Sequence, residues 1–176
     1  FGYQIEIDPS PRAWSGGLFD EARRGWLQDL KENPAGRAAF RYQEWNRFRI
    51  ECVGPWIKTW VNGVPVTDYF DTADLEGFIA LQVHSGNNTR VRWRNPRVWD
   101  LGVRSWLSAF DGRSLDGWEA MEGNWSVADG VLVGRTSPTD VAQVATGEAL
   151  ENRALSFAVL FDQAARPPPV LPPVPA

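Results

Sequence analysis

Cysteine, methionine and histidine are almost missing from this sequence, which contains one residue of each type. The single cysteine, Cys52, excludes an internal disulfide, and its place in a stretch of alternating polar and apolar residues predicts a packed thiol rather than a reactive one. One histidine cannot build a histidine zinc site, and there is no cysteine pair to replace it. Zinc chemistry and thiol redox chemistry are therefore excluded.

Long apolar runs, phosphate-binding glycine loops and nucleophile elbows are missing as well. No stretch approaches the 18 uninterrupted apolar residues of a membrane span, so none is expected. The sequence has neither a P-loop nor a Gly-x-Ser-x-Gly motif, which argues against nucleotide binding and serine hydrolysis. A net charge of −4 with dispersed basic residues argues against a nucleic-acid partner.

The residues that are present indicate antiparallel strands. Polar and apolar side chains alternate over 47–53, and residues 57–61 lead into Asn62-Gly63, a pair that tolerates the positive φ angles of a type I′ turn. The return strand starts at residue 64, and Pro65 places it at a sheet edge because proline cannot donate a ladder hydrogen bond. A β-hairpin is therefore predicted here.

Further strands are predicted along the rest of the chain at residues 3–8, 18–19, 77–85, 90–100, 106–110, 125–127, 131–133 and 155–161. Residues 21–30 have weak helical spacing and predict at most one helical turn, ended by Asn33-Pro34. The proline-rich residues 166–176 predict polyproline II or disorder.

Several of these segments resemble a known family. The stretches GYQIEID (2–8), SGGLF (15–19), EWN (44–46), WVNG (60–63), GFIALQVH (77–84) and RWRN (92–95) are similar to the second half of the 3-keto-disaccharide hydrolase domain family. The stretches FDGRSLDGW (110–118) and WSVADGVLVG (125–134) resemble the opening of the same domain. The resemblance covers roughly residues 1–162 and implies a concanavalin A-like antiparallel β-sandwich, or jelly roll, with its halves in inverted order.

The inverted order has more than one explanation. Residues 1–104 are predicted as the C-terminal half of a sandwich, 105–165 as the N-terminal half of the same or a tandem domain, and 166–176 as a tail or linker. Each half alone would leave sheet edges and an apolar face open. A permuted sandwich, or a homodimer formed by strand exchange, is therefore favoured over two independent half-domains.

The candidate chemistry lies on alternating strand positions. Gln4, Glu6 and Asp8 share one face of the first strand, as do Gln82 and His84 later in the chain and Arg92 and Arg94 on the next strand. A carboxylate near another carboxylate or in a dry cleft has its pKa raised toward the range of a general base. A water-facing sheet alternates in the same way, however, and a lone histidine at a strand end is commonly a rim residue.

Two further patterns have competing interpretations. Residues 6–8 resemble the Glu-x-Asp-x-x-Glu signature of sandwich-fold glucanases, but Pro11 replaces the final acid, which argues against a two-carboxylate retaining mechanism. Among the tryptophans, Trp14, Trp26 and Trp56 are expected in loops, where an indole can stack on a sugar ring. The following tryptophans are expected mainly in the core: Trp45, Trp60, Trp93, Trp99, Trp118 and Trp125.

If the resemblance extends to activity, it implies a carbohydrate substrate oxidised to a ketone at C3, cleaved after proton abstraction at C2. Glu6 or Asp8 would be the base, His84 the donor or acid, and Arg92 or Arg94 the stabiliser of the enolate. The substrate-binding residues would be Gln4, Gln82, Arg92, Arg94, Trp14 and Trp56. The alternative is a non-catalytic sandwich that binds carbohydrate or has a structural role.

No cofactor is expected, although the acidic turn at residues 68–74 is a candidate for a structural calcium ion. Turn carboxylates more commonly cap the backbone or stay solvated. No signal peptide can be read from the residues that follow Phe1. An extracellular or periplasmic location is therefore inferred from the resemblance alone.

Overall fold

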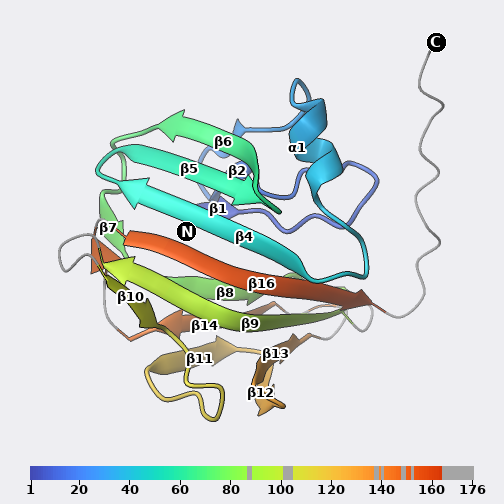
Figure 1. Cartoon of the computed structure of the whole chain (residues 1–176), viewed down its shortest axis with the longest axis vertical. Helices are drawn as coiled ribbons and strands as arrows, with labels where there is room; N and C mark the ends of the chain where they lie inside the picture. The colour runs from blue at the N-terminus through green and yellow to red at the C-terminus, as the bar shows by residue number, and fades with distance from the viewer. Residues whose placement is uncertain are drawn as a thin grey trace.

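The computed structural model is an antiparallel β-sandwich built almost entirely from strands, which confirms the expected all-β class (Figure 1). It describes residues 1–86, 89–100, 105–136, 139, 141–147, 150–151 and 153–163. The proline-rich tail predicted at 166–176 lies outside these residues. No helix in the described part of the chain is long and apolar enough to cross a membrane.

One layer is a broad sheet that crosses the front of the molecule in Figure 1. Its strand order is β12 (Asn124–Ala128), β13 (Val131–Arg135), β9 (Thr89–Asp100), β16 (Arg153–Gln163), β4 (Asn46–Val53), β5 (Trp56–Val61) and β6 (Val64–Phe70), and β10 (Ser105–Ser108) also pairs with β9.

Smaller sheets form the layer behind it (Figure 1). They are β1 (Gly2–Ile5), β2 (Leu18–Glu21) and β3 (Gly25–Gln28); β11 (Trp118–Glu122), β14 (Ala142–Thr146) and β8 (Ala80–Val83); and β15 (Leu150–Glu151) with β7 (Glu76–Gly77). The apolar core lies between the layers, with Phe48, Trp93 and Val159 from the large sheet packed in one cluster with Val83 and Val144 from the smaller ones. Removing these apolar faces from water is what holds the layers together.

Strands from early and late in the chain are neighbours in the same sheets. β16 lies between β4 and β9, with Phe157 opposite Phe48 and Val159 opposite Trp93. The rings of Phe48 and Phe157 are stacked with centroids 5.4 Å apart. β14 likewise pairs with β8. The late strands thus complete sheets begun by the early ones, while the division at residues 104 and 105 stays a prediction.

The predicted hairpin is confirmed. β5 and β6 pair in antiparallel fashion around Asn62 and Gly63, which have φ angles of 50° and 85°. β6 is the last strand in the order of the large sheet, so Pro65 lies in an edge strand as expected.

The helical turn predicted within residues 21–30 is wrong, because this segment forms the end of β2 and all of β3. The helix α1 (Pro34–Ala39) begins at Asn33-Pro34, the pair expected to end the predicted helical turn. Asn33 is its N-cap and accepts a hydrogen bond from the Gly36 N–H at 2.8 Å, and Pro34 occupies the first turn. Asparagine followed by proline is a common helix start, because the asparagine side chain accepts an N–H of the first turn and proline has no N–H that the helix would leave unpaired.

Cys52 also differs from its prediction, because its side chain is exposed at the surface of β4 rather than packed. Partial desolvation by the surrounding chain nevertheless raises the pKa of its thiol to about 11. The thiol is therefore protonated at neutral pH, which argues against a reactive role.

The tryptophans are less clearly divided between the core and the surface than expected. Trp93 and Trp118 are buried, as predicted for the core. The other tryptophans expected mainly in the core are partly exposed: Trp45, Trp60, Trp99 and Trp125.

Candidate functional site

The small sheet β1-β2-β3 presents one face to the core and one face away from it. Ile5 lies opposite Leu18 in the register and both pack toward the core. The alternate row contains Gln4 opposite Phe19, and Phe19 opposite Trp26. This row, continued by Glu6, forms the face of the candidate site.

The strand predicted over residues 3–8 ends earlier, at Ile5, so Glu6 and Asp8 lie just after β1. Glu6 is held there by its backbone. Its N–H donates to the Gly17 carbonyl at 3.0 Å, and the Gly16 N–H donates to the Glu6 carbonyl at 2.8 Å. The side chain is half-buried, and within the described residues no hydrogen bond or ion pair engages its carboxylate. The backbone of Glu6 is thus fixed by hydrogen bonds, while its carboxylate is not engaged by the described residues.

Burial raises the pKa of Glu6 above its ordinary value, and the negative charge of Asp8 raises it further. The positive charges of Arg12 and His84 act in the opposite direction. A raised carboxylate pKa moves the group toward the range in which a base both exists in its charged form and binds a proton well.

Asp8 lies only two residues away but in a different environment. It is 5% exposed, and its carboxylate accepts hydrogen bonds from the Ser10 N–H at 3.0 Å, Arg12 Nε at 2.7 Å and the Trp14 N–H at 3.2 Å. Burial alone would raise the pKa of Asp8, but these hydrogen bonds outweigh burial and hold the pKa below its ordinary value. Asp8 therefore has the environment of a loop anchor rather than of a proton acceptor.

Three aromatic side chains, those of Trp14, Trp26 and Phe19, form an aromatic wall beside the two carboxylates. Trp14 and Trp26 meet edge to face with centroids 4.8 Å apart, and the Arg12 guanidinium lies 4.8 Å from the first ring and 4.9 Å from the second. Phe19 contacts Trp26 at 5.2 Å. The expectation that Trp26 lies in a loop is wrong, because it belongs to β3.

Sequence reasoning did not select Arg12 or Phe19 for this wall. Arg12 is followed two residues later by a tryptophan, but nothing in that spacing predicts a contact with Trp26. The signal for Phe19 is its cross-strand register, which depends on the pairing of β1, β2 and β3.

His84 and Gln82 come from another sheet of the same layer. Gln82 lies opposite Gln143 and alternates with the buried Leu81 and Val83, so it faces away from the core. His84 follows β8 with the same alternation and is exposed, with Nδ1 3.1 Å from the Ser85 carbonyl oxygen. Its charge reaches Glu6, which brings the predicted acid and base into one electrostatic neighbourhood.

Arg92, Arg94 and Trp56 lie elsewhere. Arg92 and Arg94 alternate with the buried Val91 and Trp93 of β9, so they face outward from the large sheet, and their guanidinium groups lie over Trp45 at 5.8 and 4.2 Å. The expectation that Trp56 lies in a loop is wrong, because it is the first residue of β5 and lies on the outer face of that strand. The structure therefore does not bring these three residues together with Glu6.

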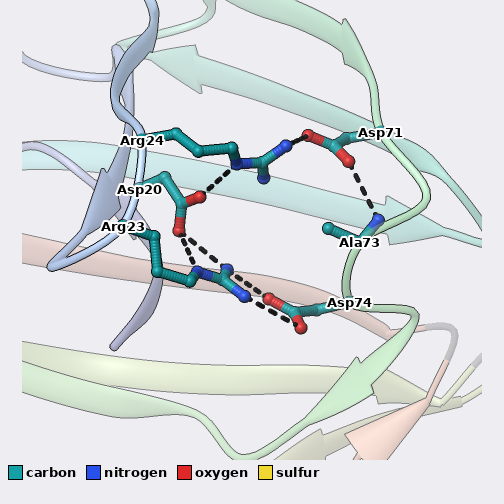
Figure 2. A network of polar contacts seen from close by, with 6 residues as sticks. All are labelled: Asp20, Arg23, Arg24, Asp71, Ala73 and Asp74. Atoms are coloured by element: carbon teal, nitrogen blue, oxygen red, sulfur yellow. Dashed lines mark hydrogen bonds and ion pairs between the residues drawn. The ribbon is translucent and has the colours of Figure 1, made fainter.

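Ion pairs tie the small sheet to the large one (Figure 2). The fully buried Asp20 of β2 accepts hydrogen bonds from Arg23 Nε at 2.7 Å and from Arg24 Nε. Arg24 Nη1 then reaches Asp71 at 2.7 Å, and Arg23 pairs with Asp74 in the segment after β6. The network fixes the turn between β2 and β3 to the segment that follows β6.

The candidate calcium turn contributes to this network. Asp71 and Asp74 are engaged by arginines, and Asp68 pairs with Lys58 at 3.1 Å. In the described ranges, no group of three or more histidine, cysteine, aspartate or glutamate residues is arranged to hold a metal ion. The carboxylates of this turn therefore bind guanidinium and ammonium groups rather than converge on one point.

Comparison with known protein families gives a match to the first part of the chain. A family model described as a 3-keto-alpha-glucoside-1,2-lyase-like domain matches residues 1–99. This range contains β1 to most of β9, and with them Glu6, Asp8, Gln82 and His84. The similarity inferred for residues 110–134 lies outside the match and stays a prediction. No curated protein matches the chain.

Proposed function

The chain belongs to the 3-keto-alpha-glucoside-1,2-lyase-like domain family, and from this membership we propose that it cleaves glycosides oxidised to a ketone at C3 of one sugar. The observation that carries the proposal is the carboxylate of Glu6. It is half-buried, free of hydrogen bonds to the described residues, raised in pKa, and within electrostatic reach of His84.

The C3 ketone acidifies the hydrogen at C2 of the substrate. Glu6 takes this proton, and the C–H electron pair forms a C2–C3 double bond while the ketone oxygen becomes an enolate. The enolate then collapses back to the ketone, a C1–C2 double bond forms, and the bond between C1 and the glycosidic oxygen breaks. His84 gives a proton to the departing oxygen. Water added across the C1–C2 double bond releases the free 3-keto sugar.

Glu6 is a better base than Asp8 in this scheme. The low pKa of Asp8 means that its carboxylate binds protons weakly, and its oxygens are already occupied by Ser10, Arg12 and Trp14. Two carboxylates whose environments separate their pKa values commonly have different roles. We assign proton transfer to Glu6 and loop anchoring to Asp8.

Arg12 takes the role that sequence reasoning gave to Arg92 or Arg94. Its charge acts on Glu6, and its guanidinium is positioned by Asp8 and the two indole rings. A fixed cation near the reacting atoms stabilises the negative charge that develops on the enolate oxygen. Gln4 and Gln82 would bind hydroxyl groups, and Trp14 would present its ring to the sugar.

The test is turnover of a purified 3-keto-disaccharide, followed by release of the two sugars. Glu6→Gln keeps the shape of the side chain but removes the base, and should lower turnover by at least about 100-fold. Glu32→Gln is the matched control, since Glu32 is an exposed carboxylate whose charge is not among those acting on Glu6, and should change turnover by no more than about threefold. A loss below about threefold for Glu6→Gln would remove this residue from the chemistry.

Deuterium at C2 of the substrate gives a second readout. Breaking of the C2–H bond by Glu6 should slow single turnovers of the deuterated sugar, provided that this step limits the rate. His84→Ala should slow departure of an unactivated sugar more than departure of a nitrophenolate, which needs no proton. Equal effects on both leaving groups would assign the acid role to another group.

A non-catalytic carbohydrate-binding module is the second candidate, favoured by the exposed indole of Trp56 on the opposite side of the molecule. A folded protein that binds sugars without cleaving the keto-disaccharide would support it. The extracellular or periplasmic location inferred from the family stays a prediction under either candidate.

A further inference from the structure

A second, separate surface lies on the outer face of the large sheet, where β4 ends and β5 begins. Val53, Trp56 and Phe70 are opposite one another in the register and form a row across three adjacent strands. Their exposed fractions are 47%, 47% and 54%. Apolar side chains normally avoid this much contact with water, so a continuous row of them commonly marks a binding surface.

A charged row runs parallel to the apolar one. Glu51 lies opposite Lys58, and Lys58 opposite Asp68, two positions further along each strand and therefore on the same face. The Trp56 platform is defined as these two rows: Val53, Trp56, Phe70, Glu51, Lys58 and Asp68. A hollow of about 190 Å³ lies between the rows, lined by Glu51, Val53, Trp56 and Lys58.

The indole of Trp56 is held in place by its neighbours. Phe70 meets it edge to face with centroids 5.0 Å apart, and Lys58 Nζ lies 5.5 Å from the ring centre. One contact from the adjacent strand β6 and one from β5 itself reduce the freedom that the ring would lose on binding. A pre-positioned ring next to hydrogen-bonding groups is suited to a ligand with one apolar face and polar edges.

The charges of the platform are balanced. Glu51 pairs with Arg49, and Lys58 pairs with Asp68 at 3.1 Å. Each acid thus has a neighbouring cation, so the surface offers both hydrogen-bond donors and acceptors without an excess of either charge. A neutral, hydroxyl-rich ligand complements this arrangement better than an anion or a cation does.

We propose that the Trp56 platform binds a neutral saccharide, with one sugar ring stacked on Trp56 and its hydroxyl groups bound by Glu51 and Lys58. The hollow is smaller than the roughly 300–1,000 Å³ typical of sites for drug-sized ligands, and so holds one ring of a longer chain. The platform does not depend on the proposed catalytic function.

The two sites lie on opposite sides of the large sheet. Trp56 and Lys58 alternate along β5 with Ile57 and Thr59, which face inward. Thr59 Oγ1 donates at 2.7 Å to the carbonyl of Gly16, in the loop that adjoins Glu6. A saccharide on the platform is therefore separated from Glu6 by the thickness of the sandwich.

The experiment is affinity electrophoresis and calorimetry with maltohexaose and cellohexaose as neutral probes and polygalacturonate as the acidic probe. We expect at least one neutral probe to bind, and Trp56→Ala to weaken that binding by at least about tenfold. Glu51→Gln should weaken it less, and Trp56→Phe should restore part of it. Phe78→Ala is the matched control, since Phe78 is an exposed aromatic residue outside the platform, at 56% against 47% for Trp56.

Failure of this proposal is distinguishable from failure of the catalytic one. Glu6→Gln should retain binding of the neutral probe, and Trp56→Ala should retain cleavage of a 3-keto-disaccharide if the wild-type protein cleaves it. Absence of binding to both neutral probes, binding to polygalacturonate alone, or binding unchanged in a folded Trp56→Ala variant would overturn the platform proposal.

Discussion

Glu6 and Asp8 show how strongly the environments of two acidic residues can differ although they are only two positions apart. Both belong to a single alternating segment, yet the Asp8 carboxylate accepts three hydrogen bonds from its own loop while the Glu6 carboxylate accepts none from the described residues. Desolvation without compensation raises a carboxylate pKa, and desolvation with several donors lowers it. The donors supplied by the loop at residues 9–15 therefore make Asp8 an anchor and leave Glu6 as the candidate base.

This contrast predicts a pH profile. A general base must be deprotonated, so kcat/KM should rise with pH through the pKa of Glu6, which lies above the ordinary glutamate value. Because the charge of Arg12 lowers this pKa, Arg12→Gln should shift the acidic limb of kcat/KM to higher pH and also lower the plateau. Profiles of kcat/KM against pH for both proteins check the prediction.

Arg41→Gln is the control for that measurement, because Arg41 is an exposed arginine whose charge is not among those acting on Glu6. Its profile should overlay that of the wild-type protein. An acidic limb that stays in place or shifts to lower pH in Arg12→Gln would show that the group titrating in catalysis is not Glu6.

At the scale of elements, the loop before β2 docks the small sheet onto the large one. The Gly16 carbonyl accepts hydrogen bonds from Thr59 at 2.7 Å and from Thr67 at 2.9 Å, which belong to β5 and β6. Gly16 has a φ of 90°, and a Cβ there would lie 2.8 Å from Val61 Cγ2 and 2.9 Å from Val66 Cγ1. Only glycine allows this approach without strain.

Gly16→Ala should therefore destabilise the protein by about 3 kcal/mol, through backbone strain together with overpacking. Gly63→Ala is the matched control: Gly63 has a φ of 85°, but its Cβ would meet no atom within 4 Å, so the strain of about 1 kcal/mol would act alone. Urea denaturation of both variants measures the difference. Equal losses of unfolding free energy in the two variants would mean that overpacking at Gly16 contributes nothing to the destabilisation.

The hairpin and β3 show where a local sequence pattern is sufficient to predict an element and where it is not. The hairpin around Asn62 and Gly63 depends on φ angles that the two residues themselves favour, and it was predicted correctly. β3 was mistaken for a helical turn because Trp26, Leu27 and Leu30 have helix-like spacing, whereas pairing with β2 decides the strand. Tertiary hydrogen bonds override a weak local preference.

At the scale of the whole molecule, every described sheet except β1-β2-β3 contains strands from both halves of the chain. β16 pairs with both β4 and β9, and β14 pairs with β8, so removal of the late strands would expose the edges of β4, β9 and β8 together with core residues such as Phe48 and Trp93. We propose that the two stretches form one sandwich with its halves in inverted order within a single chain.

A fragment containing residues 1–104 should therefore lack cooperative unfolding, because its apolar face has no cover. Addition of residues 105–165 as a separate chain should restore a cooperative transition, measured by circular dichroism against urea. Val159→Asp in the second fragment is the negative control, since Val159 is fully buried opposite Trp93. A fragment 1–104 that unfolds cooperatively by itself would contradict the single-sandwich arrangement.

The sequence by itself determined the all-β class, the hairpin and the edge position of Pro65, because alternation and turn chemistry depend on residues close together in the chain. The family came from the resemblance of short stretches within residues 1–99. Only the tertiary structure decided which late strand completes which early sheet, and that Arg92, Arg94 and Trp56 lie away from Glu6. It also decided that the carboxylate oxygens of Asp8 accept hydrogen bonds while those of Glu6 accept none from the described residues. Strand partners come from residues distant in the chain, and the donors that engage Asp8 come from a nearby loop whose folded shape no alternation pattern encodes.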